Sequence, residues 1–195
     1  MWPSRKLPSL AVMDKARTNI STLLIGIHNL DVTLFLWMMK RKHLILWAKL
    51  CRALSHTADG YGYPVLALCL WLWGGIQGTL FALTLALTFV LERPLYLLLK
   101  RGLKRNRPAA ALPDFKSFII PSDQFSFPSG HTSGAFATAT TLMLFYPQVA
   151  PLAYAWASLV GLSRVTLGVH FPTDTLAGAT MGTSLAALAS LWIMQ

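Results

Sequence analysis

Three long stretches of the sequence contain no Asp, Glu, Lys or Arg, and they cover residues 60–91, 132–163 and 175–195. Each exceeds the roughly 20 residues with which an α-helix crosses the hydrocarbon core of a membrane. Hydrophobic residues make up 54% of the chain, more than is usual for a soluble domain. These features predict an all-α integral membrane bundle rather than a soluble helical bundle.

Helix breakers divide the first two stretches. Gly74-Gly75 and Gly78 interrupt the first, and Pro147 and Pro151 interrupt the second. Each stretch is therefore expected to form two antiparallel helices joined by a tight turn, whereas the third is expected to be one helix. The five predicted membrane spans cover residues 58–74, 78–99, 131–146, 150–168 and 173–193.

The segment 28–56 alternates apolar stretches with basic clusters and contains Trp37 and Trp47. This pattern is typical of helices that lie at the lipid interface. The alternative is a sixth span through residues 20–39, which would place His28 and Asp31 inside the bilayer at a considerable energetic cost.

The chain is expected to form a single membrane domain over residues 1–195. Within it, residues 1–27 are expected to be a mobile N-terminus, 28–56 interfacial helices and 58–193 the transmembrane bundle. The only cysteines, Cys51 and Cys69, indicate neither a disulfide framework nor a metal site.

The net charge of +10 raises the possibility of nucleic-acid binding. However, the basic residues alternate with membrane-length apolar runs, and no recognised nucleic-acid motif is present. Anionic lipid is therefore the expected partner, because each Lys or Arg near a bilayer surface adds about 1 kcal/mol of attraction to acidic lipids.

Three polar clusters lie at the ends of the predicted spans. They are Lys100 with Arg107-Pro108, then Pro128-Ser129-Gly130-His131, then Ser163-Arg164 with His170 and Asp174. Lys and Arg side chains neutralise phosphoryl groups, Arg through a planar fork that matches two oxygens. An even number of crossings separates the clusters, so all three are expected to meet on one side of the membrane.

Local sequence adds to this prediction. The Pro128–His131 segment precedes an apolar helix and can present backbone N–H groups to an anion, and Gly130 permits close approach of the backbone. His170 and Asp174 are four residues apart with Pro172 between them, so His170 is expected just before a helix. Asp174 can reach back and fix the tautomer of the imidazole.

The three clusters resemble the signature of the type 2 phosphatidic acid phosphatase superfamily, which includes lipid phosphate phosphatases, bacterial class A acid phosphatases and vanadium haloperoxidases. The pattern is Lys, six residues, Arg-Pro; then Pro-Ser-Gly-His; then Ser-Arg, five residues, His, three residues, Asp. This chain matches it at every position, and the resemblance covers roughly residues 90–185.

The resemblance implies a metal-independent lipid phosphatase that needs no cofactor. His170 would attack phosphorus and form a phosphohistidine, Asp174 would hold His170, and His131 would protonate the leaving group and then activate water. The residues expected to bind the phosphate oxygens are Lys100, Arg107, Ser129, Gly130 through its backbone, and Arg164.

Several points stay open at this stage. Phosphatidic acid, phosphatidylglycerophosphate and polyprenyl diphosphates all fit as substrates, and a bacterial inner membrane fits as location, with the side of the site and the oligomeric state undecided. A lipid phosphotransferase, a haloperoxidase and a noncatalytic lipid-binding protein are the alternatives. Other polar residues are expected outside the catalytic set: Glu92 and Arg93 with no assigned role, Asp59, Asp114 and Asp123 in loops or caps, with the pocket rim as the alternative for Asp123, and His28, His43 and His56 at the interface.

Overall fold

The computed structural model describes residues 10–40 and 44–195, so the predictions for residues 1–9 and for His43 lie outside the described part. The described part contains helices and no β-strand, which confirms the all-α prediction there. The helices are α1 (Leu10–Met39), α2 (Leu44–His56), α3 (Gly62–Trp73), α4 (Gly75–Leu103), α5 (Pro108–Ala111), α6 (Gly130–Phe145), the 3-10 helix η1 (Pro147–Val149), α7 (Ala150–Thr166) and α8 (Pro172–Ile193).

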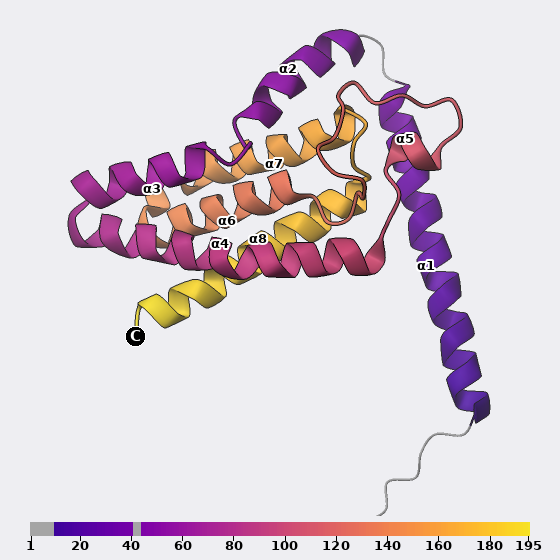
Figure 1. The fold of residues 1–195 in the computed structure, drawn as a ribbon, viewed down its shortest axis with the longest axis horizontal. Helices are drawn as coiled ribbons and strands as arrows, with labels where there is room; N and C mark the ends of the chain where they lie inside the picture. The colour runs from indigo at the N-terminus through magenta and orange to yellow at the C-terminus, as the bar shows by residue number, and fades with distance from the viewer. Residues whose placement is uncertain (1–9, 41–43) are drawn as a thin grey trace, which may run out of the picture.

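Five helices, α3, α4, α6, α7 and α8, lie side by side as a bundle (Figure 1). They correspond to the five predicted spans, with ends that differ by a few residues. The break between α3 and α4 falls at Gly74, where an added Cβ would lie 2.5 Å from the carbonyl oxygen of Leu70. Only glycine therefore fits this turn.

Helices α6 and α8 pack closely in the centre of the bundle. Two glycines one turn apart on α8 make this possible: an added Cβ would lie 2.4 Å from the Ser129 carbonyl oxygen at Gly178 and 2.1 Å from that of Ser133 at Gly182. Small residues at this spacing allow the backbones of neighbouring membrane helices to approach each other.

Large apolar side chains cover the outside of the bundle, as expected for contact with lipid rather than water. The more exposed of them include Val65, Trp71, Trp73, Ile76, Val90, Leu98, Leu152, Leu176 and Trp192. By length and composition, α4 and α8 are apolar enough to cross a membrane, whereas α3 and the apolar part of α1, residues 25–39, are shorter. Five membrane crossings therefore remain a prediction.

Helix α1 runs across one end of the bundle instead of alongside the other helices (Figure 1). It is continuous from Leu10, so no helix boundary occurs at residue 28, where the sequence analysis placed the start of the interfacial helices. The physical reason is that residues 10–39 contain no proline. The end that α1 crosses is also where α4 and α7 end and where α6 and α8 begin.

Candidate active site

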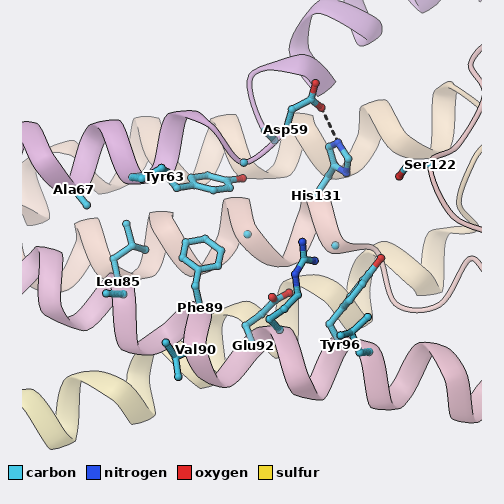
Figure 2. A pocket seen from close by; sticks show the side chains of 18 of the residues that line it. Asp59, Tyr63, Ala67, Leu85, Phe89, Val90, Glu92, Tyr96, Ser122 and His131 are labelled. Carbon is cyan, nitrogen blue, oxygen red and sulfur yellow. Dashed lines mark hydrogen bonds and ion pairs between the residues drawn. The ribbon is translucent and has the colours of Figure 1, made fainter.

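A cavity of about 1140 Å³ opens between α3, α4 and α6 at this end of the bundle (Figure 2). Six of the eight predicted site residues line it, namely Lys100, Arg107, Gly130, His131, Arg164 and His170. The other two, Ser129 and Asp174, are fully buried and do not line the cavity. The structure thus brings the three sequence clusters together around one space.

Three cations of the cavity are almost fully buried: Lys100, Arg107 and Arg164 are each 6% exposed. Lys100 lies in the last turn of α4, Arg107 directly precedes α5, and Arg164 lies in the last turn of α7. Because buried like charges repel each other, this arrangement favours an anion that several of them can bind at once.

Each of the two arginines donates to at least one neutral acceptor. Arg107 Nη1 donates to the carbonyl oxygen of Val169 at 2.6 Å and lies 3.4 Å from His170 Nε2. Arg164 Nη1 donates to Ser55 Oγ at 2.6 Å, and its buried Nε has no hydrogen-bond partner among the described residues. Arg164 therefore has a donor left for a ligand.

His170 lies in the short connection between α7 and α8 and is 2% exposed. Its Nδ1 is 3.7 Å from Asp174 Oδ2, a distance that is short enough for an ion pair but too long for a hydrogen bond. The same Asp174 oxygen accepts the backbone N–H of Phe171 at 2.8 Å. Asp174 thus caps the first turn of α8, which begins at Pro172, and faces His170 from there.

The environment keeps His170 neutral. Burial lowers its pKa to about 4, and the neighbouring Asp174 carboxylate offsets this only in part; Arg107 lowers the pKa further. A neutral imidazole retains the lone pair that nucleophilic attack requires.

His131 lies in the first turn of α6, where its Nε2 is 2.9 Å from Asp59 Oδ1 (Figure 2). The other oxygen of Asp59 pairs with Nδ1 of His56, the last residue of α2. Burial raises the pKa of Asp59, but the hydrogen bonds of His131 and His56 outweigh burial and hold this pKa below its usual range. Asp59 lies in the connection between α2 and α3, as expected of a loop residue, but its contact with His131 was not predicted.

The segment before α6 is held by its neighbours. The backbone N–H of Ser129 donates to the Asp174 carbonyl oxygen at 3.0 Å, and Ser129 Oγ is 2.9 Å from Thr132 Oγ1. At Gly130 an added Cβ would lie 3.0 Å from the ring of Tyr96, so glycine lets this ring pack against the start of α6.

Tyr96 and Asp123 are two polar neighbours of Lys100. The ammonium of Lys100 donates to Tyr96 Oη at 2.5 Å and to Asp123 Oδ2 at 2.8 Å, and Asp123 also pairs with the Arg107 guanidinium. Burial raises the pKa of Asp123, but the hydrogen bonds from Lys100 and Arg107 outweigh it and lower the pKa to about 2. Asp123 was expected mainly as a loop or cap residue, with the pocket rim as the alternative, and the structure places it in the cavity lining. Tyr96, one turn before Lys100, was not predicted.

Away from the cations, the cavity continues as an apolar groove between α3 and α4 (Figure 2). Tyr63, Ala67 and Trp71 line it from α3, and Leu85 and Phe89 line it from α4. The buried carboxyl group of Glu92 lies between the groove and the cationic end. The site therefore offers a charged compartment joined to an apolar one.

Comparison with known proteins identifies relatives of this arrangement. A family model described as the PAP2 superfamily matches residues 77–195, well over half of the chain. Phosphatidylglycerophosphatase B of Bacillus subtilis is 37% identical over 111 residues, which cover 51% of this chain and 52% of the relative. The chain spans about half to three fifths of the length of the first curated relatives it matches.

Two solved structures share the fold. The crystal structure of Aquifex aeolicus LpxE superimposes with a TM-score of 0.73 and 28% identity, covering 82% of this chain and 94% of that one. A transmembrane PAP2-type phosphatidylglycerolphosphate phosphatase from Bacillus subtilis gives a TM-score of 0.68 and 26% identity, covering 86% of each chain.

Proposed function

This chain belongs to the PAP2 superfamily, and on that premise we propose that it is a membrane lipid phosphatase. The observation that supports this most is that Lys100, Arg107 and Arg164 surround one cavity. His131 and His170 line the same cavity. Three buried cations beside two imidazoles suit an anion that is to be attacked, and phosphoryl transfer depends mainly on such charge stabilisation.

In the proposed reaction, His170 Nε2 attacks phosphorus and the bond to the leaving alkoxide breaks. With a lipid monophosphate, His131 gives its proton to that alkoxide, which leaves a phosphohistidine at His170 and a lipid alcohol. With a lipid diphosphate, the bond to the bridging oxygen breaks and the leaving group is the lipid monophosphate. Water activated by His131 then attacks the phosphohistidine and releases inorganic phosphate. Lys100, Arg107 and Arg164 stabilise the charge on the nonbridging oxygens in both steps, together with the Gly130 backbone. Ser129, which was also expected to bind the phosphate, does not line the cavity, and its hydroxyl contacts Thr132 instead.

The substrate is a lipid with a terminal phosphate or diphosphate. Its head group would occupy the cationic end of the cavity, and its chain would lie in the apolar groove between α3 and α4. Phosphatidic acid, phosphatidylglycerophosphate and polyprenyl diphosphates share this chemistry. Anionic lipids around the basic surface would raise the local concentration of such substrates.

The five bundle helices would cross a bacterial inner membrane as one domain, with the site at one membrane face. α1 would then lie along the surface of that face, because it runs across the bundle end that carries the site (Figure 1). This orientation favours the interfacial interpretation of α1 over a sixth span parallel to the other five.

A phosphate-release assay tests the proposed function. Purified protein in detergent is incubated with phosphatidic acid, phosphatidylglycerophosphate or a polyprenyl diphosphate, and the His170→Ala variant serves as control. The proposal expects release from at least one lipid by the wild type and none by the variant. The proposal would be contradicted if no phosphate were released from any of the three lipids, or if the variant released as much as the wild type. Glycerol added as an acceptor tests the phosphotransferase alternative, because it would reveal transfer of the phosphoryl group to an alcohol.

A further inference from the structure

The side chain of Arg105 lies between two buried carboxylates on different helices. Its Nη1 donates to Asp174 Oδ1 at 2.7 Å, and its Nη2 donates to Asp31 Oδ2 at 2.5 Å. Both carboxylates are 0% exposed and Arg105 is 21% exposed. A buried carboxylate needs such a partner, because an unpaired charge away from water is costly.

Helix α1 supplies Asp31, and Thr173 of α8 completes its coordination. The backbone N–H of Thr173 donates to Asp31 Oδ1 at 3.0 Å, and its hydroxyl donates to Asp31 Oδ2 at 2.5 Å. Arg105 Nη1 also donates to Thr173 Oγ1 at 2.7 Å. Asp31 thus connects α1 to the first turn of α8, the turn from which Asp174 faces His170.

Aromatic packing fixes the same face of α1 against the same segment. The rings of His28 and Phe35 contact Phe171 edge-on at 6.1 Å and 5.4 Å between centroids, and the Arg105 guanidinium lies 4.5 Å from the Phe171 centroid. His28, Asp31 and Phe35 have the spacing of one helix face. Ordered contacts therefore extend from α1 to the residues beside His170.

We propose that Asp31 and Arg105 are positioning residues that hold Asp174 in place behind His170, so that α1 is part of the active site. This inference rests on the proposed phosphatase function. Asp174 Oδ1 is bound by Arg105 and Oδ2 by the Phe171 N–H, which leaves the carboxylate one orientation toward His170 Nδ1. Asp31 lies outside the residues that match the family model, so the family signature does not include this contact.

The charges of the cluster suit the proposed reaction. Two carboxylates and one guanidinium leave one negative charge in excess beside a neutral His170. When His170 attacks phosphorus its ring becomes cationic, and the excess negative charge then stabilises it. Arg107, whose Nη1 lies 3.4 Å from the other ring nitrogen, Nε2, and Arg164 favour the neutral form of His170 before the attack.

Two charge-changing variants test the inference, Asp31→Asn and Arg105→Gln, with Asp114→Asn and Arg101→Gln at exposed positions as matched controls. We expect each test variant to lower kcat about 10–100-fold, by analogy with the loss of outer partners that orient metal-bound side chains, with KM changed less than about threefold. Size-exclusion chromatography and melting temperature establish that each variant is folded, and Arg105→Lys, which keeps the charge, should recover part of the activity.

The pH profile separates positioning from a merely structural role. Asp31→Asn removes a negative charge near His170 and should move the acid limb of kcat/KM to lower pH, whereas Arg105→Gln removes a positive charge and should move it to higher pH. The inference would be overturned if kcat fell no more than in the controls, if only KM rose, or if the acid limb moved in the same direction in both variants. In each of these cases, a wild type that is active on lipid would still support the phosphatase function. A wild type inactive on every lipid would overturn both.

Discussion

The carboxylate of Asp123 lies 2.8 Å from the ammonium of Lys100, and its second oxygen pairs with Arg107. An acidic side chain therefore binds two of the three cations that we propose as phosphate ligands. An anionic ligand has to displace this carboxylate from Lys100 and Arg107 or share them with it.

Removing this charge should strengthen anion binding. Asp123 is about one-third exposed, and an exposed ion pair contributes up to about 1 kcal/mol, which corresponds to about fivefold in a binding constant. We expect Asp123→Asn to lower the inhibition constant of vanadate by up to this factor, with Asp114→Asn unchanged. Weaker inhibition in Asp123→Asn would indicate instead that Asp123 holds the two cations in their binding positions.

The low pKa of His170 predicts how the first step depends on pH. Because burial lowers this pKa to about 4, the imidazole stays neutral as the pH falls from 8 toward 5 and is protonated only near pH 4. The rate of phosphoenzyme formation in single-turnover experiments should therefore stay constant over the pH range in which an ordinary histidine, with a pKa of about 6.5, becomes protonated. A midpoint near that ordinary value, with a substrate whose own ionisation is complete, would show that His170 is not the nucleophile.

The contact between Asp59 and His131 predicts an effect that depends on the leaving group. A carboxylate beside an imidazole stabilises its protonated form, which has to donate the proton to a departing alkoxide. Asp59→Asn should therefore slow hydrolysis of a lipid phosphate about tenfold, part of the contribution of a general acid. Hydrolysis of p-nitrophenyl phosphate, whose leaving group needs no proton, should change much less.

A control for this experiment is His56→Gln, because His56 contacts Asp59 from the outside and its side chain is 81% exposed. It should leave both substrates nearly unaffected. If Asp59→Asn slows both substrates equally, Asp59 acts on phosphate binding or on folding rather than on proton donation.

The sequence predicted the bundle well because its signals are local. Runs without charged residues mark the helices, and Gly74 and Pro147 mark the turns that separate α3 from α4 and α6 from α7. The clustering of Lys100 and Arg107 with the two histidines followed from the number of predicted membrane crossings. Each pair of antiparallel helices begins and ends on the same side of the membrane. Each of these steps needs only the length of the charge-free runs and the positions of helix-breaking residues.

The partners of the site residues could not be predicted in this way. Asp31 contacts Thr173, 142 positions later in the chain, and Asp59 contacts His131, 72 positions later. Such pairs depend on how α1 and the α2–α3 connection pack against the bundle, for which neither segment carries a periodic signal. Asp31 in particular was weighed as a costly charge in a membrane span, whereas the structure surrounds it with donors.

Chelation tests the metal-independent mechanism, which remains a prediction. In the proposed site, Lys100, Arg107 and Arg164 already supply the positive charge that a metal ion gives in other phosphatases. Excess EDTA should therefore leave phosphate release unchanged, and vanadate should inhibit by mimicking five-coordinate phosphorus. Loss of activity in EDTA that added Mg²⁺ restores would show that a metal ion takes part.

The close approach of α6 and α8 predicts that Gly182 cannot be enlarged without loss of stability. An added Cβ would lie 2.1 Å from the Ser133 carbonyl oxygen and 2.9 Å from the Ala137 nitrogen, both of which are backbone atoms that move only with the helix. Overpacking of this kind typically costs about 1–3 kcal/mol, so Gly182→Ala should lower Tm in detergent by several degrees.

Gly102→Ala is the matched control, because nothing lies within 4 Å of a Cβ there, and it should leave Tm equal or slightly higher. An unchanged Tm in Gly182→Ala would mean that α6 and α8 are farther apart in the membrane than in this structure, and the Ser129–His131 segment at the start of α6 would then lie farther from Asp174.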